Sequence, residues 1–364
     1  MIANIKILSK SLSVTFKNNY EENFPNIWLR DHAKDEENWD KRSHQRKTHT
    51  ASLDINIQIK KAIVKNNGSH IEILWSDMDN TVKYSSDYLF KNILDKQRKK
   101  HSFKLWKKKD IKQEIYFNFK EILNDRKFKL FLKKLFNFGF CVITNCETNL
   151  KAVEVIANKI GYVRQSIFGG LWEFESNEDM ADSAYTKEEL RPHTDSTYSN
   201  DAPGLQLLLC CDYNALGGES IMVDGFNIAN TIKSDNEDLF NLMTKIEVPG
   251  KYVGDGVILE AKRPIFKLDN NELIQVSFNN YDRTEFRTEG STTYKFYEAI
   301  KKFDTLVNLD EFQWRHILKP GELLIFNNWR VLHGRGSFKG KRKMAGCYIN
   351  MEDFKSVCKI HGLN

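Results

Sequence analysis

The segment Phe326-Asn327-Asn328-Trp329-Arg330-Val331-Leu332-His333-Gly334-Arg335 carries the clearest structural signal in this chain. Its apolar residues are typical of a β-strand, and this strand contains His333 directly before a glycine. Short apolar runs of the same kind, separated by Gly, Asn and Asp turns, fill most of the sequence after Gly161. We therefore predict strands at residues 204–211, 219–224, 272–278, 322–326 and 346–350, with one helix near 293–303.

The sequence before this strand-rich part has a mixed periodicity. Residues 117–124, 125–138 and 150–160 have the spacing of amphipathic helices, and residues 139–144 form an apolar run typical of a buried strand. Many short strands with helices supplied early favour a double-sheet jelly roll over a parallel α/β fold. The expected fold class is mainly β with flanking helices, with a double-stranded β-helix (jelly-roll) domain at residues 110–364.

The first 95 residues have the pattern of a small β domain. We predict strands at residues 11–16, 51–59, 61–64, 70–75 and 81–84, and a hairpin turn at Asn66-Asn67-Gly68, where Asn and Gly tolerate positive φ. Residues 96–109 are densely basic and lose periodicity. They are predicted to form a linker between the two domains.

The composition limits the classes of function. A length of 364 residues, with 41% hydrophobic and 29% charged residues, is typical of a globular protein with more than one core. The net charge of +6 comes with Lys runs such as Lys107-Lys108-Lys109, which we interpret as solvated surface because no zinc-finger spacing or basic-aromatic alternation accompanies them. We expect no nucleic-acid partner and, since no apolar stretch reaches about 18 residues, no membrane partner.

The cysteines and the N-terminus favour a reducing compartment. Neither a Cys-x-x-Cys pair nor an evenly spaced framework is present, which fits reduced thiols. The first residues lack both an apolar signal core and an Arg/Ser-rich transit pattern. A cytoplasmic location is expected. The cysteines are Cys141, Cys146, Cys210, Cys211, Cys347 and Cys358.

His193-Thr194-Asp195 is the first candidate metal-binding element. In an extended segment, residues i and i+2 point to the same side, so the imidazole and the carboxylate can hold one ion. A His-x-Asp triplet alone occurs by chance, and its histidine is more often structural. Together with His333, however, it supplies the two histidines and one carboxylate of the facial triad in non-haem iron(II) oxygenases, which leaves positions open for cosubstrate and O2.

A second anchor for an anionic cosubstrate follows His333. Arg342 can pair bidentately with a carboxylate of 2-oxoglutarate, which a lysine cannot do in the same geometry. Ser220, after Gly217-Gly218, can add a hydroxyl donor to the same carboxylate.

From about Gly161 to the C-terminus, the chain resembles the trimethyllysine and γ-butyrobetaine dioxygenases, which are iron(II)- and 2-oxoglutarate-dependent oxygenases. The segment Trp28-Leu29-Arg30-Asp31-His32 and its neighbours at residues 43–46 and 50–54 resemble the small β domain that precedes the catalytic domain in the same enzymes. The resemblance therefore covers nearly the whole chain. The matching catalytic segments are residues 182–187, 192–198, 217–227, 278–283, 328–335 and 346–348.

This resemblance implies His193, Asp195 and His333 as iron ligands, with Arg342 and Ser220 on 2-oxoglutarate. It implies that O2 decarboxylates 2-oxoglutarate to succinate and CO2, and that C3 of a trimethylammonium substrate is hydroxylated. It also implies a homodimer.

The resemblance also implies a substrate pocket. A cage for the quaternary ammonium is implied by four aromatic residues, since aromatic faces suit a cation that cannot donate hydrogen bonds. Aromatic residues in a β domain are otherwise core, and Phe168 is the cage position where this alternative is strongest because relatives carry Tyr there. Asn279 matches a residue that binds the substrate carboxylate, although an Asn-Asn pair is more often a turn. The cage residues are Phe168, Trp172, Tyr185 and Tyr348.

Two further positions favour Nε-trimethyllysine over γ-butyrobetaine. The butyrobetaine enzymes carry Asn and Tyr where this chain has Asp182 and Ser196. Only trimethyllysine has an α-ammonium group, which an aspartate matches, whereas a bare carboxylate would be repelled. The alternative for Asp182 is a solvated loop residue. The remaining candidates are γ-butyrobetaine, a trimethylammonium phosphonate, and a non-catalytic quaternary-ammonium binding protein.

One feature of the relatives is missing. They commonly hold a structural zinc in the N-terminal domain through cysteines shortly after the Trp-Leu-Arg-Asp segment, but no cysteine occurs here before Cys141. A closed zinc site needs four good N or S donors. We therefore expect no structural zinc.

Overall fold

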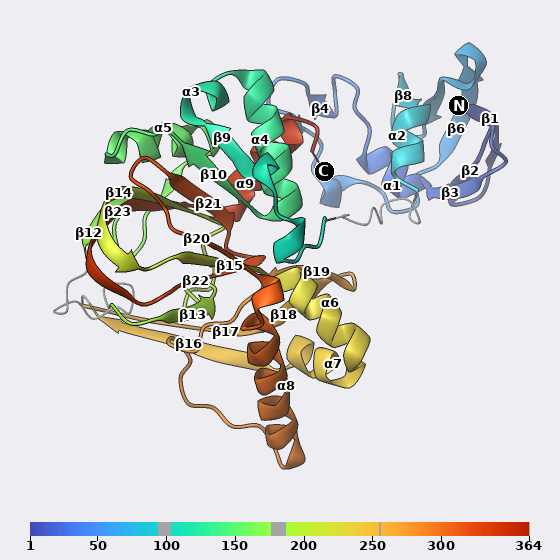
Figure 1. The fold of residues 1–364 in the computed structure, drawn as a ribbon. Helices are drawn as coiled ribbons and strands as arrows, with labels where there is room; N and C mark the ends of the chain where they lie inside the picture. Colours follow the sequence, from blue (N-terminus) through green and yellow to red (C-terminus); the bar gives the residue numbers. More distant parts are fainter. Residues whose placement is uncertain (94–102, 176–186, 255, 364) are drawn as a thin grey trace. The chain divides into compact units, whose positions relative to one another are not determined.

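The computed structural model describes residues 1–93, 103–175, 187–254 and 256–363. The chain divides into two compact units, residues 1–100 and residues 101–364 (Figure 1). Within the described residues, no helix is both long enough and apolar enough to span a membrane.

The N-terminal unit consists of small antiparallel sheets around one apolar core. One sheet has the order β1-β2-β3 and a second the order β6-β7-β8, with the short pair β4-β5 beside them. Buried Val14, Ile71 and Trp75 belong to the core that the two larger sheets share. The elements are β1 (Ile2–Ile7), β2 (Ser11–Phe16), β3 (Glu21–Pro25), α1 (Asn26–Asp31), β4 (Trp39–Asp40), β5 (Gln45–Arg46), η1 (Thr50–Ser52), β6 (Ile59–Lys65), η2 (Asn66–Gly68), β7 (His70–Trp75), β8 (Thr81–Ser85) and α2 (Ser86–Lys91).

The predicted hairpin at Asn66-Asn67-Gly68 is confirmed, since all three residues have positive φ and connect β6 to β7. The predicted strand at residues 51–59 is wrong. This range starts in η1, and only Ile59 belongs to a strand. The alternation of Leu53, Ile55 and Ile57 imitates a strand, but Ile55 is exposed.

Two β-sheets form the frame of the second unit. The larger sheet has the order β11-β23-β14-β21-β10-β9, with β12 also paired to β23, and the smaller has the order β13-β22-β15-β20. Phe140 and Leu324 of the larger sheet and Met222 and Trp314 of the smaller one belong to the same buried cluster, so the two sheets pack face to face. The larger sheet contains β9 (Tyr116–Asn118), β10 (Phe140–Thr144), β11 (Val163–Arg164), β12 (Leu171–Glu175), β14 (Leu205–Gly217), β21 (Leu323–Asn327) and β23 (Phe338–Ile349); the smaller contains β13 (Leu190–His193), β15 (Ser220–Asp224), β20 (Gln313–His316) and β22 (Val331–Arg335).

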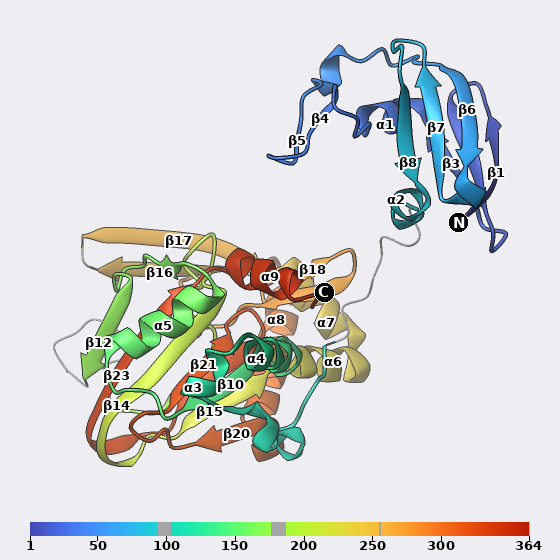
Figure 2. The ribbon, with the colours of Figure 1, turned by 90° about the horizontal axis from the view of Figure 1, so that it is seen from above.

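Helices cover the outer face of each sheet (Figure 1). One group lies along the larger sheet (Figure 2). There Phe131, Ile156 and Phe354 share a buried cluster with Leu207 and Ile325. The other group packs on the smaller sheet through a second cluster. The first group is α3 (Phe119–Ile122), α4 (Asp125–Phe138), α5 (Leu150–Ile160) and α9 (Met351–Ile360); the second is α6 (Gly225–Asp235), α7 (Glu237–Lys245) and α8 (Ser291–Val307), with the hairpins β16 (Glu247–Gly254)–β17 (Val257–Pro264) and β18 (Phe266–Asp269)–β19 (Glu272–Val276) beside them.

The jelly-roll fold class is thus confirmed, with three differences in detail. Helices α6, α7 and α9 lie where the sequence pattern predicted only strands and turns. The second unit also begins before the predicted Asp110, because Trp106 is buried and donates its indole N–H to the Phe138 carbonyl at 2.6 Å. No sequence signal marked this buried tryptophan, because basic residues surround it. Residues 117–124 contain the short strand β9 before α3 rather than one helix.

Candidate active site

Two neighbouring strands bring the histidines together. His193 ends β13 and pairs in register with His333 of β22, so the two imidazoles lie on the same face with ring centroids 4.4 Å apart. Gly334 allows this approach, because a Cβ there would lie only 2.6 Å from the Leu190 carbonyl oxygen. The glycine after His333 is therefore a packing requirement of the site.

Asp195 lies just beyond the end of β13, where the chain turns. Because β13 ends at His193, the extended geometry predicted for this triplet ends before the aspartate, and the φ of +57° at Ser196 belongs to the turn that follows. The side chain of Asn328 holds the backbone here: its Oδ1 accepts from the Asp195 N–H at 2.7 Å and its Nδ2 donates to the Asp195 carbonyl at 3.2 Å. The Tyr348 hydroxyl donates to Asp195 Oδ2 at 2.8 Å. Both the backbone and the carboxylate of Asp195 are thus fixed from outside the triplet.

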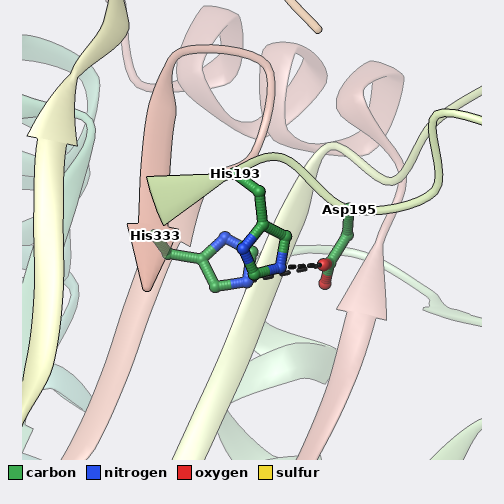
Figure 3. Close-up of side chains that lie close together, drawn as sticks. All are labelled: His193, Asp195 and His333. Carbon is green, nitrogen blue, oxygen red and sulfur yellow. Dashed lines mark ion pairs between the residues drawn. The ribbon is translucent and has the colours of Figure 1, made fainter. Parts of the chain in front are cut away.

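The three side chains converge on one point (Figure 3). Asp195 Oδ1 lies 3.4 Å from Nε2 of His193 and 3.4 Å from Nε2 of His333. One potential ligand atom from each residue lies within 4.8 Å of the others. In the described part of the chain, this is the one set of three or more His, Cys, Asp or Glu side chains arranged in this way. Nδ1 of His193 donates to the Arg191 carbonyl at 2.8 Å, which leaves Nε2 with a lone pair for a metal.

The electrostatics of the group also fit a cation. Burial lowers the pKa of His193. The hydrogen bond to Asp195 and its negative charge raise this pKa by more than burial lowers it, so the net shift is upward. Burial raises the pKa of Asp195, but the two imidazoles outweigh this effect and hold the carboxyl pKa well below its usual range. Burial, together with the neighbouring His193, lowers the pKa of His333 despite the opposing Asp195. Asp195 thus favours positive charge beside it, and a bound cation would take the place of the proton on His193. Two imidazoles in their neutral form and one carboxylate are a donor set that suits iron(II) and leaves coordination positions free.

A cavity of about 140 Å³ opens at these side chains. Its wall contains Arg342 and Ser220, the two residues predicted to bind 2-oxoglutarate, and also Arg335. Arg342 is 7% exposed and its Nε has no hydrogen-bond partner among the described residues. Burial, with the neighbouring Arg342 charge, lowers the pKa of Arg335 to about 10. Two guanidinium groups therefore face one cavity beside the triad, and an anion there would offset the cost of burying them.

The same cavity has aromatic walls. Phe168, Trp172 and Tyr348 all line it, with ring centroids 6.4 Å apart for Phe168–Trp172 and 5.9 Å for Trp172–Tyr348. Gly346 makes room for the indole, since a Cβ there would lie 2.3 Å from Trp172. Three of the four predicted cage residues are thus brought together.

The remaining predicted residues divide into two groups. Ser196 and Asn279 line the cavity. The Asn279 side chain also accepts from the Tyr281 N–H at 2.9 Å, so the turn expected as an alternative is present as well. Asp182 and Tyr185 lie outside the described residues.

Three residues of the site were missed as functional candidates. Arg335 and Asp282 both line the cavity, and Asn328 supports Asp195. All three occur in segments noted for their resemblance to the family. Residue type alone did not mark them, because an Arg, Asp or Asn in a turn is usually solvated.

Comparison with known proteins agrees with this geometry. Residues 102–348 match the family of taurine catabolism dioxygenases TauD, TfdA, and residues 4–90 match the γ-butyrobetaine hydroxylase-like N-terminal family. A trimethyllysine dioxygenase of Meyerozyma guilliermondii is 32% identical over 97% of this chain and 94% of its own length. The mitochondrial trimethyllysine dioxygenase of Mus musculus is 30% identical, covering 94% of this chain and 83% of its own. The γ-butyrobetaine dioxygenase of Homo sapiens is 27% identical, covering 93% and 91%.

Among solved structures, a taurine dioxygenase from Burkholderia xenovorans superposes with a TM-score of 0.51, covering 64% of this chain and 84% of its own at 10% identity. At this identity the likeness concerns the fold alone. The family matches extend over both units, and the relatives cover nearly the full chain. The chain therefore belongs to the TauD, TfdA dioxygenase family and is a 2-oxoglutarate-dependent dioxygenase of the trimethyllysine and γ-butyrobetaine dioxygenase type.

Proposed function

We propose that this enzyme hydroxylates a trimethylammonium amino acid, with Nε-trimethyllysine as the preferred substrate and 3-hydroxy-trimethyllysine as the product. The observation that carries the proposal is that one cavity is lined by the His193, Asp195 and His333 cluster, by buried Arg342 and half-buried Arg335, and by three aromatic residues. An iron site, an anion site and a quaternary-ammonium site are then within reach of one small molecule and one cosubstrate.

In this proposal, His193, Asp195 and His333 hold iron(II). When bound, iron(II) supplies the chemistry by which O2 converts 2-oxoglutarate to succinate and CO2 and the second oxygen atom enters the substrate. The protein's own residues position the participants. Asn328 and Tyr348 keep the Asp195 carboxylate directed at the metal position, and the Arg191 carbonyl keeps the His193 ring in the required tautomer.

Arg342 binds the distal carboxylate of 2-oxoglutarate, with Ser220 as a hydroxyl donor. Arg342 is buried, and its guanidinium carbon lies over the Phe338 ring, 5.2 Å from the ring centroid. Arg335 adds a second positive charge to the same wall. The orphaned Nε of Arg342 is a donor that a carboxylate would satisfy.

The aromatic walls bind the trimethylammonium group. A quaternary ammonium has no N–H to donate, so faces such as those of Trp172 and Tyr348 attract it more specifically than polar groups would. The cage proposed here is Phe168, Trp172 and Tyr348, with Tyr185 as its fourth member by sequence.

The preference for trimethyllysine rests on carboxylates that can pair with the α-ammonium group. Asp282 lines the described cavity, and its Oδ2 accepts from the Thr197 hydroxyl at 3.1 Å, which orients it. Asp182 is the residue that sequence favours for the same task. Ser196 and Asn279 lie at the cavity wall and are proposed to bind the α-carboxylate.

Measurement of kcat/KM for trimethyllysine and γ-butyrobetaine tests this proposal, in wild type and in the Asp182→Asn and Asp282→Asn variants. Removal of one partner of a buried charge pair costs about 2 to 5 kcal/mol, or roughly thirty-fold to a few thousand-fold in affinity. We expect at least one variant to lose this much on trimethyllysine and little on γ-butyrobetaine.

Arg287→Gln is a suitable control, because Arg287 is an exposed charge of the segment that follows Asp282. A wild-type preference for γ-butyrobetaine, or equal losses on both substrates in both variants, would contradict the trimethyllysine assignment. The absence of succinate release with either compound would contradict the substrate class.

A further inference from the structure

The structure buries four arginines among its described residues, and three of them have an anion or a proposed anion. Arg30 pairs with Asp77 at 2.9 Å and Arg330 with Asp224 at 2.8 Å. Arg342 faces the cavity where the 2-oxoglutarate carboxylate is proposed to bind. This pattern follows from the high cost of burying a guanidinium charge without compensation.

Arg263 is the exception. It lies in β17 with 9% of its surface exposed, yet it forms no ion pair within the described residues. Its hydrogen bond there is a long one, from Nη2 to the Thr197 carbonyl at 3.4 Å. Burial lowers the pKa of Arg263, and the distant Asp201, already paired with Arg164 at 2.9 Å, only partly opposes this shift. An arginine stays protonated in proteins, so a positive charge is buried here with little to offset it.

Arg263 faces a second cavity, separate from the active-site pocket. The cavity has a volume of about 20 Å³, and its wall includes a second arginine, Arg283, and Ser277. Arg283 contacts the ring of Tyr297 at 5.9 Å but forms no ion pair within the described residues. Its backbone pairs with Gly250 of β16, which holds Arg283 at the cavity wall.

We propose that this cavity binds a small inorganic anion, with Arg263 and Arg283 as its cationic partners and the Ser277 hydroxyl as a further donor. A cavity needs about 10 to 15 Å³ to hold a single water molecule. A cavity of about 20 Å³ therefore has room for one monatomic ion, and chloride is the appropriate probe. Neither arginine forms an ion pair within the described residues, so their positive charges favour an anion over a neutral water.

The position of this anion site connects it to the active site. Asn279 lines both cavities, and Thr197 of the anion site lies two residues after Asp195. The segment between them is held by the bond from the Thr197 hydroxyl to Asp282. An anion here would therefore stabilise the loop that carries Asp195 and the loop that carries Asn279.

Thermal unfolding in two salts tests the proposal on the full-length protein. Sodium chloride replaces sodium gluconate in steps at constant ionic strength, under anaerobic conditions with iron(II) and saturating 2-oxoglutarate, so that the Arg342 site already holds a carboxylate. We expect a saturable rise of Tm with chloride, of about 3 °C at ten times the dissociation constant. Equal Tm values in the two salts would overturn the proposal.

Arg263→Gln and Arg283→Gln should each remove most of the chloride-specific shift. Arg287→Gln is the matched control on the same segment and should keep it in full. A retained shift in the Arg263→Gln variant would refute the site. Displacement of chloride by saturating trimethyllysine would also refute it, since the cavity would then be part of the substrate pocket.

Crystals soaked in sodium bromide give a direct measurement that is independent of the stability of any variant. An anomalous bromide peak between Arg263 and Arg283 is the expected result. Bromide peaks only elsewhere on the protein would overturn the assignment.

Discussion

Tyr348 has two proposed tasks that one substitution separates. Its ring lines the pocket beside Trp172, and its hydroxyl donates to Asp195 Oδ2 at 2.8 Å. Tyr348→Phe keeps the aromatic face and removes the hydrogen bond. We expect this variant to bind iron(II) more weakly while its KM for trimethyllysine changes little.

The magnitude follows from the nature of the bond. The Asp195 side chain is only 17% exposed, and a hydrogen bond to a charged group contributes about 1.5 to 3 kcal/mol. At 1.4 kcal/mol per decade, its loss corresponds to roughly ten-fold to a hundred-fold in iron(II) affinity. Groups that orient metal ligands have effects of about the same size. By contrast, Phe still offers a π face, so the cation–π contribution of about 0.5 to 2 kcal/mol is largely kept.

Equilibrium dialysis of iron(II) against the protein under nitrogen measures the affinity, and succinate release measures KM. Tyr348→Leu lacks both the hydroxyl and the ring, and should add a raised substrate KM to the loss of iron affinity. Tyr294→Phe, at an exposed position on α8, is the control and should match wild type in both. If Tyr348→Phe binds iron(II) as tightly as wild type, the hydroxyl does not support Asp195.

Further variants and one metal measurement test other parts of the site. Asp195→Ala or His193→Ala should abolish substrate-dependent succinate release without lowering Tm in the metal-free protein, since too few donors remain for iron(II); substantial residual activity in either would refute the ligand assignment. Arg342→Ala should raise the KM for 2-oxoglutarate by roughly thirty-fold or more, as loss of a buried charge partner does, and an unchanged KM would exclude Arg342. Asn328→Leu should weaken iron(II) binding by about ten-fold or more while circular dichroism stays native, because the backbone of Asp195 loses two partly buried hydrogen bonds; wild-type affinity would show that the backbone contacts do not matter. Metal analysis after mild chelation should find no stoichiometric zinc, and its presence would overturn the expectation from the missing cysteines.

The sequence predicted best those elements whose signals are local. Helix α4 was predicted with the bounds observed, because an amphipathic run of 14 residues lies between the capping Asn124 and Gly139, which has a φ of +79°. Helices α6 and α7 were missed for the opposite reason. Their caps, Asp224 and Asn236, are also turn residues, and each helix is too short to show a clear period against the strands around it.

The candidate site shows the same division between local and distant information. The residue types of His193, Asp195 and His333 indicated metal binding from the sequence alone. The register between β13 and β22 places the two histidines side by side. The role of Asn328 had no such signal. It acts on Asp195 across 133 residues of sequence, and an Asn in a turn between two strands has an adequate local explanation.

The turn from Asn328 to Arg330 connects β21 of the larger sheet to β22 of the smaller one, and each of its residues forms a long-range bond. Asn328 holds the backbone of Asp195, and the Trp329 indole donates to the Ala202 carbonyl at 2.9 Å. Arg330 pairs with Asp224 at the end of β15 and donates to carbonyls at Lys104 and Asn137. Because His333 follows on the same strand, this one turn sets the positions of two of the three proposed ligands relative to both sheets. The geometry of the proposed metal site is therefore a property of how the sheets are joined. Substitution of Asn328 is expected to alter iron binding before it alters the fold, whereas substitution of Arg330 would also leave Asp224 buried without its partner and destabilise the domain.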